Sequence, residues 1–164
     1  MPGAVRASIA QKIVPKSTHA LVISTQDVQR TVAGLRAAFP PTALHAFAAK
    51  ANALESVLGV LRDSGMGCEV ASAGEFEMAK RVFDTKNIVF DSPTKTMEEL
   101  ESALYTQCYL NIDNFQELDR VAKMHAARPI TATVGLRINP QVGAGALAGL
   151  RVPNVVQLDG APDG

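Results

Sequence analysis

A lysine that follows an apolar run carries the first side chain in this sequence suited to covalent chemistry. Lys50 comes directly after residues 43–49, Ala-Leu-His-Ala-Phe-Ala-Ala, a run typical of a buried strand. Parallel α/β folds place catalytic groups at the carboxyl ends of their strands. A lysine there can form a Schiff base with an aldehyde cofactor when its surroundings favour the neutral amine. The alternative is a solvated lysine at the edge of a strand.

Two further charged residues lie inside apolar runs. Glu69 stands within the run 67–70, where a carboxylate is costly to bury without a partner. It is either a strand-end residue that faces solvent or a functional acid. Arg137 lies within the run 134–138 and needs an anion or an aromatic ring to face. A structural salt bridge from Arg137 to Glu69 or Asp91 is an alternative to a role in binding.

Strand-like and helix-like runs alternate from about residue 40 onward. The strand candidates are short and largely apolar, as expected of parallel strands covered on both faces. They cover residues 43–48, 67–70, 87–90, 108–112 and 131–138. Successive strands begin roughly 20 to 25 residues apart, which fits β-α units with short loops. This alternation predicts a parallel sheet, either open and doubly wound or part of a (β/α)8 barrel.

The helices predicted after the first four strands share one kind of start. A capping residue stands three positions before a glutamate, so the cap can accept a backbone N–H while the glutamate reaches back. The four pairs are Asn52 with Glu55, Ser72 with Glu75, Thr96 with Glu99 and Asn114 with Glu117. Two apolar stripes follow at helical spacing: Leu54, Val57, Leu58 and Leu61, then Phe115, Leu118, Val121 and Ala122. An earlier helix is predicted over residues 26–39, with Val28, Val32, Leu35 and Phe39 on one face.

The composition excludes several classes of protein. Among 164 residues, 16 Lys and Arg balance 16 Asp and Glu, so no basic excess indicates a nucleic-acid partner. No apolar run approaches the roughly 20 residues that span a bilayer. Cys68 and Cys108 have no nearby cysteine or histidine, which predicts reduced core thiols and neither a metal site nor a disulfide. A cytoplasmic location is expected, although the basic residues before Asp27 faintly resemble an organelle transit segment.

Five segments, taken in order, resemble a known family. They are HAFAAKAN (45–52), GCEVASAGE (67–75), IVFDSPTKT (88–96), NIDNFQE (111–117) and GLRINP (135–140). In this order and spacing they resemble the ornithine/diaminopimelate/arginine decarboxylases, fold-type III pyridoxal-phosphate enzymes with an alanine-racemase-like barrel. The resemblance covers roughly residues 20 to 145. It implies a partial (β/α)8 TIM-type barrel with about five parallel strands and intervening helices.

The resemblance also implies roles for single residues. Lys50 would hold pyridoxal 5'-phosphate as a Schiff base and exchange it for the amine of the substrate. Glu69 would lie near the cofactor at the end of the second strand, and Arg137 would lie close to its ring. The ring would act as an electron sink for the loss of carbon dioxide from an α-amino acid. The segments distinguish neither a decarboxylase from a racemase nor one amino acid from another.

The family pattern ends near Gly145. The family's ring-stacking histidine, its glycine-rich phosphate loop, the acid for the pyridine nitrogen and the C-terminal β-domain have no match in this sequence. The expected organisation is an N-terminal extension (1–19), the N-terminal part of the cofactor-binding barrel (20–145) and an irregular tail (146–164). We expect a truncated chain that is inactive alone. Unpaired strand edges favour poor solubility or association with another chain.

Two other functions stay open at this point. A short paralogue could bind the cofactor without turnover, or dock onto a full-length homologue or a second copy. An unrelated nucleotide-binding sheet is the other alternative, although residues 143–149 have the spacing GxGxxxG instead of GxGxxG. Cofactor uptake, co-purification with a homologue, or stabilisation by a nucleotide would separate these possibilities.

Overall fold

The structure, a computed structural model, describes residues 22–138 and 154–157. The expected N-terminal extension, the glycine-rich run after the fifth strand and most of the expected tail lie outside the described residues. The chain divides into two units, Met1–Ala43 and Leu44–Gly164. Among the described residues, no helix combines the length and the apolar character that crossing a membrane requires.

The first unit contains the helix α2 (Thr25–Ala37). Ser24 is its N-cap, and the Ser24 Oγ accepts the N–H of Asp27 at 3.2 Å. The helix predicted over residues 26–39 is therefore confirmed and ends two residues earlier than expected. Of its predicted apolar stripe, only Val32 is buried.

The second unit is built on one six-stranded sheet whose strands follow one another in chain order. The strands are β1 (Ala46–Ala48), β2 (Gly67–Val70), β3 (Ile88–Asp91), β4 (Tyr109–Ile112), β5 (Thr133–Ile138) and β6 (Asn154–Gln157). The first five are parallel, and β6 runs antiparallel to β5. The five predicted strands are confirmed. The sixth lies in the tail that the sequence predicts to be irregular.

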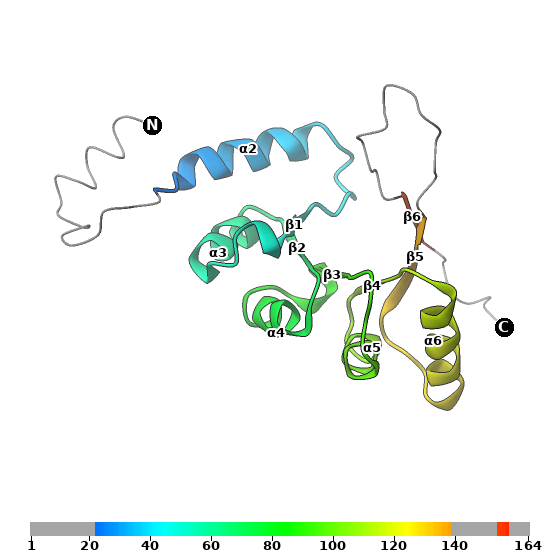
Figure 1. The fold of residues 1–164 in the computed structure, drawn as a ribbon. Coiled ribbons are helices and arrows are strands. Elements are labelled where there is room, and N and C mark those ends of the chain that lie inside the picture. Colours follow the sequence, from blue (N-terminus) through cyan, green and yellow to red (C-terminus); the bar gives the residue numbers. More distant parts are fainter. Residues whose placement is uncertain (1–21, 139–153, 158–164) are drawn as a thin grey trace, which may run out of the picture. The chain divides into compact units, whose positions relative to one another are not determined.

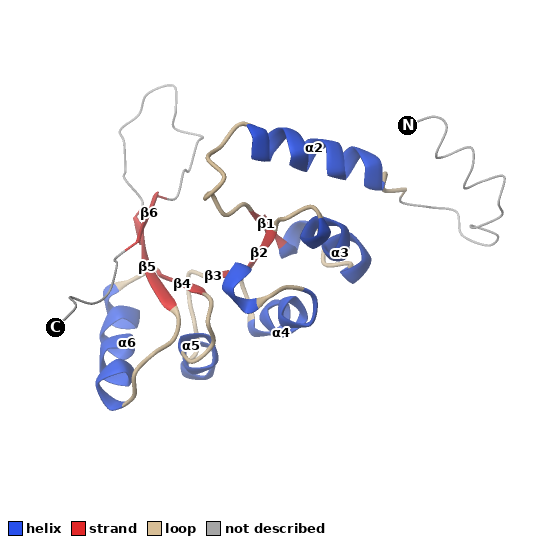
Figure 2. Ribbon diagram, turned by 180° about the vertical axis from the view of Figure 1, so that it is seen from behind, coloured by secondary structure: helices blue, strands red, loops and turns tan. Residues whose placement is uncertain are grey.

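Four helices cover one face of this sheet, each on the connection between two parallel strands (Figure 1). They are α3 (Glu55–Asp63), α4 (Ala73–Val82), α5 (Met97–Leu104) and α6 (Phe115–Ala127). A short 3-10 helix, η1 (Ala49–Ala51), follows β1, and a second one, η2 (Thr85–Asn87), precedes β3. The view from behind shows α3 to α6 on the same side of the strands (Figure 2). This arrangement confirms the predicted α/β fold of parallel strands with intervening helices.

The two faces of the sheet differ in polarity. Side chains that point toward the helices form the core, where the rings of Phe90 and Phe76 have centroids 5.3 Å apart. Other strand residues of that face are also fully buried: Cys68, Val70, Ile88 and Leu110. Because side chains alternate along a strand, the register places Glu69, Asp91 and Arg137 together on the opposite face. We call this side of β1 to β5 the polar face.

Three of the four predicted helix caps are confirmed. Backbone N–H groups donate to the caps at 3.3 Å (Glu75 to Ser72), 3.2 Å (Glu99 to Thr96) and 2.9 Å (Glu117 to Asn114). The prediction for Asn52 is wrong, because α3 begins only at Glu55 and has Leu54 as its N-cap. Asn52 ends η1, and its Oδ1 accepts the N–H of Leu54 at 3.1 Å. An asparagine that bonds the backbone two residues onward forms a turn, which delays the helix.

The predicted apolar stripes are confirmed only in part. In α3, Leu58 and Leu61 are buried. In α6 the stripe is wrong at its start, because Phe115 is 89% exposed and Glu117 is 2% exposed. Residues two positions apart lie on nearly opposite sides of a helix. Hydrogen bonds hold Glu117 on the inner side of α6, so Phe115 faces solvent.

Gly67, the first residue of β2, has no room for a side chain. A Cβ there would lie 2.3 Å from the backbone oxygen of Asn87. We expect Gly67→Ala to lower the free energy of unfolding by about 1–3 kcal/mol, the usual cost of overpacking. Urea unfolding measures this, with Gly59→Ala in α3 as control. A Cβ on Gly59 would meet nothing within 4 Å, so alanine there should stabilise by about 0.5–1 kcal/mol. Equal effects of the two substitutions would contradict the prediction.

Candidate functional site

Lys50 lies in η1, directly after β1, at the carboxyl end of the parallel strands. The neighbouring Ala49 is fully buried, and its carbonyl oxygen accepts the N–H of Asn52 at 3.0 Å. This short helix fixes the backbone of Lys50, while the lysine itself is exposed. An accessible primary amine on an anchored backbone is suited to reaction with an aldehyde.

Glu69 is half-buried on the polar face. Burial raises the pKa of its carboxyl, and the charges of Asp91 and Glu75 raise it further. The opposite charges of Lys50 and Arg137 lower that pKa. The structure thus brings the two cations of the predicted site within electrostatic range of its predicted acid.

The Glu69→Gln variant tests this environment through the pH dependence of stability. The pKa of Glu69 in the folded chain lies above its ordinary value of 4.5, so folding strengthens proton binding there. The stability that Glu69 contributes is complete below the ordinary pKa and is lost as the pH rises through the folded pKa. We therefore expect Glu69→Gln, which stays neutral, to gain stability over the unmodified chain as the pH rises to neutrality. Urea unfolding of both chains across this range measures the gain, and a constant difference would count against it.

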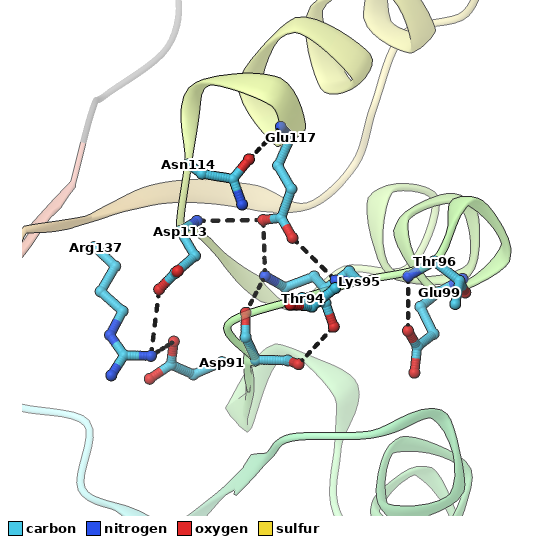
Figure 3. Close-up of polar contacts among 10 residues, drawn as sticks. Asp91, Thr94, Lys95, Thr96, Glu99, Asp113, Asn114, Glu117 and Arg137 are labelled. Carbon is cyan, nitrogen blue, oxygen red and sulfur yellow. Dashed lines mark hydrogen bonds and ion pairs between the residues drawn. The ribbon is translucent and has the colours of Figure 1, made fainter.

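Arg137 of β5 points toward two carboxylates (Figure 3). Its Nη1 lies 3.3 Å from the Oδ1 of Asp113 and 3.7 Å from the Oδ1 of Asp91. Of the two partners that the sequence left open, Asp91 is confirmed. The Oδ1 of Asp91 is buried and has no hydrogen-bond partner among the described residues. This oxygen can accept a hydrogen bond from a further donor.

Sequence reasoning missed Asp113 and considered Asp91 only as a structural partner of Arg137. Asp91 ends β3 and Asp113 follows β4 directly. Both stand at the same edge of the sheet as Lys50, where the carboxyl ends of parallel strands meet. A polar residue at the end of each apolar run was a signal in the sequence that could have found them.

A buried ion pair close to these acids, between Lys95 in the loop after β3 and Glu117 in α6, was also missed. The side chains of Lys95 and Glu117 are 0% and 3% exposed, and Nζ lies 3.1 Å from Oε2. The Nζ of Lys95 also donates to the carbonyl oxygen of Ser92 at 2.7 Å. Glu117 accepts the backbone N–H groups of Lys95 at 3.0 Å and of Asp113 at 3.2 Å. In the sequence, Lys95 stands in a polar loop, where a solvated lysine is the ordinary expectation.

The two cysteines are free and buried, as predicted for core thiols. Burial is the main cause that raises the pKa of Cys68 to about 11 and that of Cys108 to about 12. At neutral pH these thiols stay protonated, so neither supplies a thiolate nucleophile. In the part of the chain that the structure describes, no group of three or more His, Cys, Asp or Glu side chains is placed to hold a metal ion.

Known proteins share this sequence pattern. The family described as "Pyridoxal-dependent decarboxylase, pyridoxal binding domain" matches residues 25–149. A diaminopimelate decarboxylase of Bacteroides thetaiotaomicron is 38% identical over 110 residues, which cover 66% of this chain and 28% of the relative. An L-glutamyl-[BtrI acyl-carrier protein] decarboxylase of Niallia circulans is 37% identical over 101 residues, 60% of this chain and 24% of the relative.

Solved structures share the fold. The crystal structure of diaminopimelate decarboxylase from Helicobacter pylori complexed with L-lysine aligns with a TM-score of 0.70 and 26% identity, over 83% of this chain and 34% of that one. The Paramecium bursaria Chlorella virus arginine decarboxylase bound to agmatine aligns with a TM-score of 0.66 and 23% identity, over 80% and 35%. This chain thus spans about a third or less of the length of its relatives, and the predicted partial barrel is confirmed. The chain belongs to the pyridoxal-dependent decarboxylases, within their pyridoxal binding domain, and its cofactor is pyridoxal phosphate.

Proposed function

We propose that Lys50 is the residue that binds pyridoxal phosphate, with Glu69 and Arg137 beside the bound cofactor. One observation supports this most strongly. Lys50 follows β1 and Arg137 lies in β5, and the charges of both act on the half-buried carboxyl of Glu69. The three residues that the sequence selected separately lie in or just after strands β1, β2 and β5, and this supports a shared site.

The residues present fit this cofactor in their chemistry. Lys50 offers an exposed primary amine to an aldehyde. Arg137 has a guanidinium whose side chain is 33% exposed, so it keeps surface for a ligand while two acids hold it. Asp91 offers a buried oxygen that still lacks a donor among the described residues. An amine, a cation and a carboxylate oxygen without a hydrogen bond among the described residues suit a polar aromatic aldehyde.

Each residue of this chain has a separate task in the proposed site. When bound, pyridoxal phosphate supplies an electron sink that stabilises the charge left on an α-carbon as carbon dioxide departs. Lys50 attaches the cofactor to the end of β1. Glu69 keeps its proton to higher pH than a solvated glutamate does, because burial raises its pKa. Arg137 stays cationic and is oriented by its acidic partners.

The proposed reaction is the decarboxylation of an α-amino acid. Several relatives are named as diaminopimelate decarboxylases, and one solved relative is complexed with L-lysine. An amino acid with a second amino group is therefore the first substrate class to test. We assign this activity to a protein as long as these relatives. The match to the Bacteroides enzyme covers only 28% of that enzyme.

Equilibrium dialysis of the 164-residue chain against pyridoxal phosphate tests the proposed site. We expect saturable binding of one cofactor per chain. Arg137→Gln should weaken it about ten- to hundredfold, because hydrogen bonds to charged groups contribute about 1.5–3 kcal/mol. Arg120→Gln, at an exposed position of α6, is the matched control and should leave binding unchanged. Uptake that does not saturate, or equal weakening by both substitutions, would contradict the proposal.

A further inference from the structure

The loops after β3 and β4 are joined by a buried polar clamp, which we define as Lys95 and Glu117 (Figure 3). Lys95 belongs to the loop between β3 and α5, and Glu117 lies in the first turn of α6. Their charged groups are 3.1 Å apart, and both side chains are almost completely buried. Asn114 fixes the start of α6, because its Oδ1 accepts the N–H of Glu117 at 2.9 Å. The clamp therefore ties one loop to the anchored start of the next helix.

The clamp reaches the two acids that hold Arg137. Asp91 directly precedes Ser92, whose carbonyl oxygen accepts the Nζ of Lys95 at 2.7 Å. The backbone N–H of Asp113 donates to the Oε2 of Glu117 at 3.2 Å. The clamp thus forms a hydrogen bond to Asp113 itself and to the residue that follows Asp91. Both carboxylates then lie within 3.7 Å of the same Arg137 nitrogen.

The main effect of the clamp is to fix the positions of the two loops, and its net contribution to stability is secondary. The desolvation of a buried ion pair often offsets its attraction, so apolar residues of similar volume frequently stabilise a protein as well. Here both charges also bond to backbone groups at defined positions: Glu117 accepts two N–H groups, and Lys95 donates to one carbonyl oxygen. Charge-assisted bonds are stronger than bonds between neutral groups, so these bonds fix where the loops run.

We propose that Lys95 and Glu117 are positioning residues for the cofactor site, which fix the loops of Asp91 and Asp113 and thereby direct the guanidinium of Arg137. Both clamp residues are buried, so we infer that they act through these two acids. The link to the cofactor rests on the proposed function. The direction of Arg137 is a property of the chain without cofactor and can be tested separately.

The side-chain Nε–H signal of Arg137 in the nuclear magnetic resonance spectrum of the cofactor-free, 164-residue chain reports its surroundings. Arg137→Lys removes the signal and so assigns it. We expect Glu117→Gln to shift this signal in the direction that Asp91→Asn and Asp113→Asn shift it. An unchanged signal in a folded Glu117→Gln chain overturns the proposal.

Two further variants keep this test decisive. Lys123→Met breaks an exposed ion pair with Asp119 on the same helix, α6, and should leave the Arg137 signal unchanged. Lys95→Met removes the other half of the clamp and should shift the signal as Glu117→Gln does. If Lys95→Met does not fold, Glu117→Gln decides alone, since its amide oxygen keeps an acceptor for a backbone N–H.

Cofactor affinity separates this inference from the proposed function. In dialysis against pyridoxal phosphate, Glu117→Gln should bind about tenfold more weakly while circular dichroism shows it folded, because a misdirected Arg137 would lose one charged hydrogen bond to the cofactor. A shifted Arg137 signal with unchanged affinity overturns the link to the cofactor. If the unmodified chain binds no cofactor but the signal shifts, the proposed function fails and the positioning of Arg137 stands. If the unmodified chain binds it and neither readout changes, only the inference fails.

Discussion

Lys95→Met is expected to lower the free energy of unfolding by about 3–5 kcal/mol, the usual cost of leaving one member of a buried ion pair alone. The carboxylate of Glu117, 3% exposed, would lose the cation 3.1 Å away and gain no water in its place. The carbonyl oxygen of Ser92 would lose its donor in the same substitution. Urea unfolding followed by circular dichroism measures the loss.

Two controls show whether burial causes that loss. Lys123→Met breaks the exposed pair with Asp119, whose side chains are 74% and 63% exposed, and should cost only about 0.3–0.5 kcal/mol. Adding Glu117→Gln to Lys95→Met removes the stranded charge and should recover part of the stability. A cost for Lys95→Met as small as that for Lys123→Met would mean that the buried charges do not depend on each other.

Lys50→Ala should abolish covalent uptake of pyridoxal phosphate while leaving the fold intact. The lysine is exposed, and a surface substitution of this kind changes stability by at most about 0.5 kcal/mol. Its amine, however, is the one group at the end of β1 that can bond to the aldehyde. The absorption of lysine-bound cofactor after gel filtration measures uptake.

Lys123→Ala is the matched control for Lys50→Ala, since it removes an equally accessible amine from a helix. Its side chain is 74% exposed and forms an ion pair with Asp119 of the same helix. Uptake should therefore persist in Lys123→Ala. Equal loss in the two variants would mean that uptake comes from surface lysines in general.

Most of the fold could be predicted because its signals are local. Apolar runs of strand length and polar caps three residues before a glutamate are set by neighbours in the sequence. The helix start predicted at Asn52 failed because the Asn52 side chain instead accepts the N–H of Leu54 in a turn that follows η1. The apolar stripe predicted for α6 failed because Glu117 is buried against a partner, Lys95, that lies more than twenty residues away in the chain.

The candidate site could be predicted only where a residue contrasts with its own segment. Lys50, Glu69 and Arg137 are charged residues in or beside apolar runs, and this contrast is visible without a structure. Lys95 stands among polar loop residues, so nothing nearby marks it, and Asp113 is marked only by its place after an apolar run. Their importance depends on the strand register, which brings β3, β4 and β5 together. Pairing across the sheet is a non-local property that spacing does not encode.

Borohydride reduction of the 164-residue chain after incubation with pyridoxal phosphate, followed by peptide mass mapping, tests the central claim most directly. Reduction fixes the cofactor to whichever amine carries it. We predict one label per chain, on the peptide that contains Lys50. Label spread over exposed lysines such as Lys86 and Lys123, or no label at all, would contradict the claim that Lys50, with Glu69 and Arg137, forms a cofactor site.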